Sequence, residues 1–268
     1  MTMTVAIGGL GAIGLPLARA LDRGAVPGLR LVAVAAADPV RAATRVAEFE
    51  IPPEVVSLAR LAEADIVVEA APASVFLAIA EPAIAAGRIL VVASAGALLP
   101  RLELARRAVK TGARILVPTG ALLGLDAVRA AAEGPVESVT LETRKPPAGL
   151  TGAPYLRRQR IDLAGLTEPR RVFAGNALAA AAGFPANVNV AAALALAGIG
   201  PVRTKVEIWA DPGIDRNIHT IRVEAEAARF TMRIENVPSL ENPRTGRLTP
   251  LSLLACLRGL VSVLKAGS

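Results

Sequence analysis

Near its N-terminus the chain reads Val5-Ala6-Ile7-Gly8-Gly9-Leu10-Gly11-Ala12-Ile13-Gly14, an apolar segment that leads into the pattern Gly-x-Gly-x-x-Gly. Leu15, Ala18 and Leu21 then repeat at the helical period, so this region predicts a strand, a tight turn and a helix. Such a turn lets backbone N–H groups and a helix N-terminus approach a pyrophosphate, whereas the glycines alone would also fit an ordinary strand–helix turn. We expect a dinucleotide to contact the loop itself: Gly9, Gly11, Ala12, Ile13 and Gly14.

Composition narrows the classes of function. The chain has 268 residues, of which 53% are apolar and only 3% aromatic, and its formal net charge is +7. Scarce aromatics argue against stacking of single-stranded nucleic acid, and scattered arginines argue against a nucleic-acid stripe. We therefore expect no nucleic-acid partner, because the same charge suits an enzyme whose cofactor and substrate are anions.

Cysteine usage and apolar runs bear on the compartment. The one cysteine, Cys256, can form neither an internal disulfide nor a cysteine-rich metal site, and we expect no bound metal. The most membrane-like stretch, 177–200, is interrupted by glycine, proline and asparagine. The early residues lack the basic region of a signal peptide. We therefore expect a cytoplasmic protein without membrane contact.

The first part of the chain predicts an α/β domain. Short apolar runs alternate there with helical patterns, at residues 5–8, 31–36, 66–70, 89–94 and 115–118. Continuously apolar runs are typical of strands that are buried on both faces. We therefore expect a doubly wound parallel sheet, that is, a dinucleotide-binding Rossmann domain over residues 1–120.

The pattern changes after about residue 120. Alternating strands are expected at 136–143, 202–209, 217–225 and 229–237, and the last three lack intervening helices. This arrangement predicts an α+β domain with a mixed or antiparallel sheet over residues 121–247, which we expect to carry the substrate site and the oligomer contact. A closing helix within 248–268 is expected to pack back on the first domain.

An acidic residue follows the second predicted strand. Asp38 can accept hydrogen bonds from an adenosine ribose and repel a 2′-phosphate, which favours NAD. Arg41 and Arg45 could instead accommodate that phosphate, so NAD and NADP both stay open. Asp38 also precedes Pro39 as a helix N-cap would, and the two roles are compatible.

The third predicted strand ends at the edge where ligands of open α/β sheets bind. Ala71 and Pro72 follow it, and we expect them to contact the cofactor. Glu69 is expected to cap the strand end or to lie in solvent rather than to perform chemistry.

His219 is the one histidine of the chain. By the period of a strand it shares a face with Ile221 and Val223, where an isolated histidine is ordinarily a satisfied core residue. The sheet of a substrate domain is, however, where a nicotinamide must meet its substrate. We therefore expect His219 to act as a general acid or base.

Further motifs follow the glycine loop in a specific order: TGALLGLD (119–126), RKPP (144–147), FPANVNVAAALALAGIG (184–200), ADP and then NIH (210–212 and 217–219), and ENPRTG (241–246). With these motifs the chain resembles the L-aspartate dehydrogenase family. The resemblance implies NAD- or NADP-dependent oxidative deamination of L-aspartate to iminoaspartate, which water converts to oxaloacetate and ammonia, or which enters NAD biosynthesis.

The resemblance also implies residue roles. The active-site histidine of the family falls on His219, and its cofactor contacts fall on the glycine loop, on Ala121, and on Asn187 or Asn189. The two substrate carboxylates need cationic or N–H partners, for which Lys145 is the leading candidate and Asn242, Arg244 and Thr245 follow.

Three questions stay open at this point. A related dehydrogenase could act on another small dicarboxylate, a semialdehyde or an imine. A non-catalytic protein that senses NAD would carry the same glycine loop. We expect a homo-oligomer, namely a dimer, although the sequence does not give its interface.

Overall fold

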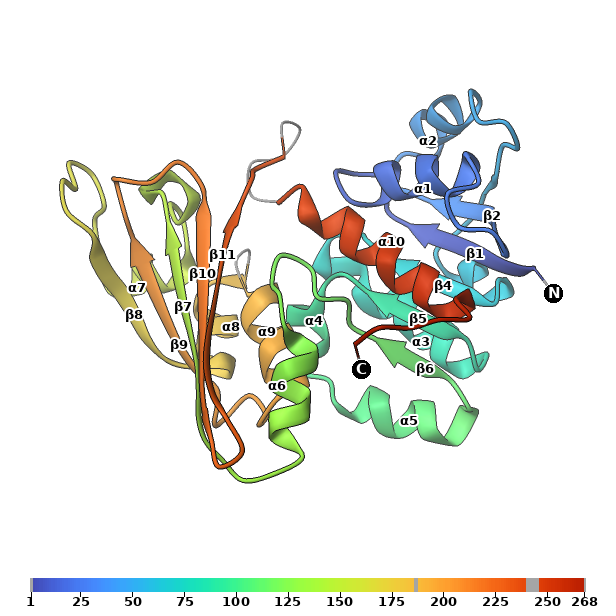
Figure 1. Ribbon diagram of the computed structural model, residues 1–268. Coiled ribbons are helices and arrows are strands. Elements are labelled where there is room, and N and C mark those ends of the chain that lie inside the picture. The colour runs from blue at the N-terminus through green and yellow to red at the C-terminus, as the bar shows by residue number, and fades with distance from the viewer. Residues whose placement is uncertain (1, 186–187, 240–245, 268) are drawn as a thin grey trace. The chain divides into compact units, whose positions relative to one another are not determined.

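The computed structural model describes residues 2–185, 188–239 and 246–267. The chain forms two compact units (Figure 1). Unit 1 comprises residues 1–118 and 249–265, and unit 2 comprises residues 119–248 and 266–268. The predicted site residues Asn187, Asn242, Arg244 and Thr245 lie outside the described residues.

Unit 1 is built on a six-stranded sheet in which every pairing is parallel. The strands are β1 (Met3–Gly8), β2 (Leu29–Ala35), β3 (Glu54–Val55), β4 (Ile66–Glu69), β5 (Ile89–Val92) and β6 (Arg114–Leu116). Their order, β3-β2-β1-β4-β5-β6, is the order of dinucleotide-binding sheets. The predicted Rossmann fold is therefore confirmed. Strand β3 was not predicted from the sequence, and it is only two residues long.

Helices flank this sheet (Figure 1). They are α1 (Gly14–Asp22), α2 (Pro39–Val46), α3 (Phe76–Ala85), α4 (Ala95–Leu98), α5 (Glu103–Thr111) and α10 (Leu248–Val261), with short 3₁₀ turns η1 (Ala59–Glu63) and η2 (Ala73–Val75). The buried core of unit 1 combines Val5 and Ile7 of β1 with Leu17 of α1. Leu253 and Leu257 of α10 belong to the same cluster, so the C-terminal helix packs in unit 1. Among the described residues, none of the helices has the length and apolar character that crossing a membrane requires.

Unit 2 carries a five-stranded mixed sheet, as predicted. Its strands are β7 (Val136–Lys145), β8 (Arg170–Asn176), β9 (Lys205–Ala210), β10 (Asn217–Ala225) and β11 (Arg229–Asn236), in the order β11-β10-β7-β9-β8. The β7–β9 pair is parallel and the other pairs are antiparallel. The sequence missed β8, an edge strand with several exposed residues inside an arginine-rich stretch.

The helices of unit 2 are α6 (Leu125–Ala132), α7 (Pro154–Arg158), α8 (Ala177–Gly183) and α9 (Asn189–Ala197), with a 3₁₀ turn η3 (Pro147–Gly149). Helix α6 packs against β10, and α8 packs against β8 and β9. Leu141, Val206 and Ile221 lie on the covered face of the sheet and are buried. The opposite face carries charged pairs such as Glu142 with Arg222. This alternation fixes the register, because a slip of one residue would bury the charges.

Candidate active site

The glycine loop of unit 1 has the geometry that a dinucleotide requires. Gly9 has φ +101°, and a Cβ there would lie 2.4 Å from the carbonyl oxygen of Ala70. A Cβ on Gly14 would lie 1.8 Å from the carbonyl oxygen of Gly9, so the crossing of helix and strand requires a glycine. At Gly11, by contrast, a Cβ would meet no atom within 4 Å, which leaves the backbone open to a ligand. A pyrophosphate fits these residues at the N-terminus of α1.

The other loop residues are placed in different ways. Ile13 is the N-cap residue of α1, and its partly buried side chain packs against the core. Ala12 lies half-buried in the turn. Arg45 of α2 donates from Nη1 to the carbonyl oxygen of Leu10 at 2.6 Å, which ties α2 to the loop.

Asp38 lies just beyond the carboxyl end of β2 and caps α2, where its Oδ1 accepts a hydrogen bond from the backbone N–H of Arg41 at 2.9 Å. The side chain is exposed, so its second oxygen can still receive a ribose hydroxyl. The capping role inferred from the sequence is thus observed, and Arg41 is exposed on the first turn of the same helix.

The loop after β4 adjoins the glycine turn. The N–H of Ala70 donates to the carbonyl oxygen of Gly8 at 2.8 Å, and Pro72 precedes η2. The N–H of Ala71 donates to Oε1 of Glu69 at 3.2 Å. Glu69 is fully buried, so the expectation that it lies in solvent is wrong, whereas the capping expectation holds.

His219 is buried on the helix-covered face of the sheet in unit 2. Its partner across the β7–β10 pair is Thr143, whose Oγ1 lies 3.0 Å from Nδ1 of the ring. Burial, assisted by the positive charge of Lys145, lowers the pKa of His219 to about 3. The imidazole is therefore neutral near pH 7, and one of its ring nitrogens carries no proton.

Lys145 belongs to the same cluster. It lies two residues after Thr143 on β7, so both side chains point to the same face, and it is only 5% exposed. Its carbonyl oxygen accepts a hydrogen bond from the N–H of Asp211 at 2.8 Å, which anchors the strand end. The end of the sheet thus gathers a base and a cation on one face, and the rows beyond them are apolar, with Leu141 and Ile221.

Ala121 is held to this sheet by Asn236. Nδ2 of Asn236, at the end of β11, donates to the carbonyl oxygen of Ala121 at 2.9 Å. Asn236 is buried, and its Oδ1 has no hydrogen-bond partner within the described part of the chain. Local sequence carried no signal for this contact, because the two residues are 115 positions apart.

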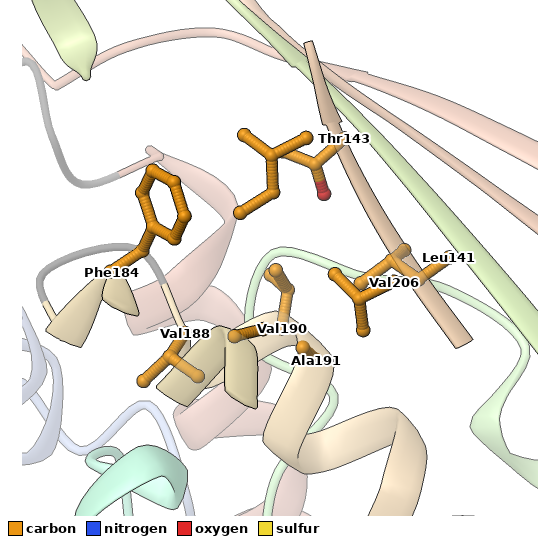
Figure 2. A pocket seen from close by; sticks show the side chains of 9 residues that line it. Leu141, Thr143, Phe184, Val188, Val190, Ala191 and Val206 are labelled. Carbon is orange, nitrogen blue, oxygen red and sulfur yellow. The ribbon is translucent and has the colours of Figure 1, made fainter. Parts of the chain in front are cut away.

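A small apolar pocket lies between the sheet and helices α8 and α9 (Figure 2). Leu141, Thr143, Phe184, Val188 and Ala191 are among its lining residues, and Thr143 supplies its polar atom. Asn189, the first residue of α9, is exposed beside this pocket.

Comparisons with known proteins identify the family of the chain. Residues 126–260 match the family model described as aspartate dehydrogenase, C-terminal. The chain is 54% identical to L-aspartate dehydrogenase 3 of Bordetella bronchiseptica, in an alignment that covers 98% of this chain and 97% of the relative. The chain belongs to the aspartate dehydrogenase family. It is also 52% identical to L-aspartate dehydrogenase of Bradyrhizobium diazoefficiens, over 99% of this chain and 94% of that one.

Two further matches support the fold of this family member. Residues 9–118 match the model described as homoserine dehydrogenase, NAD binding domain. The chain is also similar to the crystal structure of aspartate dehydrogenase from Thermotoga maritima, with 25% sequence identity and a TM-score of 0.75. The match covers 100% of each chain.

Proposed function

We propose that this protein is an L-aspartate dehydrogenase, which oxidises L-aspartate to iminoaspartate with NAD or NADP and yields oxaloacetate and ammonia. The observation that carries the proposal is the buried His219, within hydrogen-bond distance of Thr143 and on the same face as Lys145, in a sheet of the aspartate dehydrogenase type. The relatives at 54% and 52% identity are named for this activity.

In the proposed mechanism, Lys145 binds a substrate carboxylate, and Asn242 and Thr245 are proposed to assist it. NAD or NADP held at the glycine loop of unit 1 would supply the hydride acceptor for Cα of the substrate. In the tautomer with a proton on Nδ1, His219 donates to Thr143 and presents Nε2 as the base. In one role, Nε2 takes a proton from the amine, and loss of this proton together with the hydride leaves a C=N bond. In the other role, Nε2 takes a proton from the water that adds to the imine carbon. Ammonia leaves from that adduct and oxaloacetate remains.

For the cofactor, we propose contacts with the glycine loop, Asp38, Ala71, Pro72 and Ala121. Asn189 is proposed to join them because it is exposed at the start of α9. Asn187 stays an alternative. Use of NADP as well as NAD is proposed from Arg41, which is exposed beside Asp38.

A steady-state assay tests the proposal. L-Aspartate with NAD or NADP should produce the reduced cofactor, and oxaloacetate with ammonia should consume it, whereas D-aspartate serves as the control. If the enzyme does not respond to L-aspartate but turns over another dicarboxylate, a semialdehyde or an imine, the proposed substrate is wrong. Cofactor binding without any turnover would instead indicate an NAD sensor.

We also propose that the protein is a homodimer. Support comes from the open face of the unit 2 sheet, where Trp209 stacks with the guanidinium of Arg144 at 4.9 Å among partly exposed charges. Sedimentation analysis measures the assembly directly. Residence in the cytoplasm and a place in NAD biosynthesis stay predictions.

A further inference from the structure

Glu69 is a buried acid at the carboxyl end of β4, the edge where ligands of open α/β sheets bind. It ends β4, which lies between β1 and β5, and it pairs with Gly8 and Val92. Its exposed fraction is 0%. A carboxyl group without water is costly unless donors surround it, so its partners identify what it does.

The partners of Glu69 come from two loops. Its Oε1 accepts hydrogen bonds from the N–H of Ala71 at 3.2 Å and from Oγ of Ser94 at 3.0 Å. Its Oε2 accepts from the N–H of Ser94 at 2.9 Å. One carboxyl group therefore joins the chain after β4 to the chain after β5, at the carboxyl ends of both strands.

The same carboxyl group sets a wall of the glycine turn. The missing Cβ of Gly9 would lie 2.8 Å from Cα of Ala71, so these backbones are in close approach. The position of Ala71 in turn depends on its bond to Glu69. Ligands of open α/β sheets bind outside this edge of the sheet.

We propose that Glu69 is a positioning residue for the cofactor: its carboxylate holds the Ala71 and Ser94 loops in the arrangement that the bound dinucleotide requires. The proposal rests on the proposed NAD(P) use. Burial raises the pKa of Glu69, and the N–H and O–H donors around it counter part of that rise. A carboxylate is suited to this place because it only accepts hydrogen bonds, and every neighbour that faces it here donates.

The test is Glu69→Gln, which keeps the shape and replaces one acceptor oxygen by an NH₂ group that opposes a donor. We expect the dissociation constant of NADH, measured by fluorescence titration, to rise about tenfold, the scale of one buried polar group left unpaired. The KM for NAD should rise with it, while kcat and the KM for L-aspartate at saturating NAD change less than about threefold.

Asp65→Asn is the matched control. Asp65 precedes β4 at the opposite end of the same strand and accepts hydrogen bonds from the N–H and Oγ1 of Thr4 at 2.8 and 2.7 Å. This variant should lower Tm and leave NADH affinity unchanged. If Glu69→Gln lowers Tm equally and also leaves NADH affinity unchanged, Glu69 is a structural brace and the proposal is wrong.

Ser94→Ala keeps the test valid if Glu69→Gln does not fold. It removes the hydroxyl donor and retains both backbone donors, so we expect NADH affinity to fall about threefold. An unchanged affinity would contradict the proposal. Because the titration needs no substrate, an enzyme that ignores L-aspartate but binds NADH would refute the proposed function and leave this inference testable.

Discussion

Glu69 in unit 1 and His219 in unit 2 are both closed off from solvent, but their surroundings differ. Glu69 faces donors on both oxygens, two of them backbone N–H groups from loops near its own strand. Within the described part of the chain, the ring of His219 has one hydrogen-bond partner, Thr143, which is 76 positions away. Glu69 uses both oxygens to hold the loops after β4 and β5, whereas one ring nitrogen of His219 has no hydrogen-bond partner among the described residues. This difference underlies the proposed roles, in which Glu69 positions a cofactor and His219 transfers a proton.

The largest effect that this contrast predicts is on His219. His219→Ala should lower kcat about 10²–10⁴-fold, the usual contribution of a general base, and leave NADH affinity nearly unchanged. Steady-state kinetics and NADH titration of the same preparation measure the two quantities. Turnover within a few-fold of the wild type would show that the base lies elsewhere.

The pH dependence of the free energy of unfolding tests the lowered pKa of His219. The folded pKa of His219, about 3, lies below its ordinary value of 6.5, so between these values the unfolded chain binds the extra proton. The contribution of His219 to stability is therefore complete above about pH 6.5 and is lost progressively as the pH falls towards 3. Urea unfolding between pH 7 and 4 should show this slope, and His219→Gln should flatten it. An equal slope in the variant would assign acid sensitivity to other groups.

Local sequence determines unit 1 more completely than unit 2. The three glycines of the turn lie within the six residues Gly9 to Gly14, and the Asp38 cap bonds a residue three positions away, so both patterns are visible in the sequence. The contacts of Thr143 with His219 and of Asn236 with Ala121 were not predicted, because the partners lie 76 and 115 positions apart and meet only in the folded sheet. Capping or solvent exposure was predicted for Glu69, and its burial could not be foreseen because its partner Ser94 follows the neighbouring strand.

Strand assignment failed for related reasons. Strand β8 alternates poorly and bears two exposed arginines, Arg170 and Arg171, because it lies at the sheet edge, where solvent covers one side. The central strand β4 is buried along its whole length and was predicted from its apolar run. Burial on both faces thus leaves a clearer trace in sequence than an edge position does.

Thr143→Val measures how much kcat depends on the hydroxyl group that contacts His219. Valine keeps the branched shape of threonine but cannot bond Nδ1, so the ring loses the contact that orients it. We expect kcat to fall roughly tenfold, corresponding to about 1–3 kcal/mol for a buried group left unpaired. Thr143→Ser should restore most of the rate. Thr140→Val is the control, because Thr140 lies on the opposite face of the same strand; an equal loss there would refute a specific role for Thr143.

The smallest predicted effect concerns which cofactor unit 1 holds. Asp38→Ser retains an oxygen that can cap α2 at the N–H of Arg41 but removes the negative charge that opposes a 2′-phosphate. Because the side chain is exposed, the change should raise the ratio of kcat/KM for NADP to that for NAD only roughly fivefold, on the scale of one exposed charge interaction. Asp38→Ala, which loses both charge and cap, should give a similar ratio with a lower Tm. If the ratio does not move in either variant, Asp38 acts only as a helix cap, and cofactor choice must be set elsewhere in unit 1.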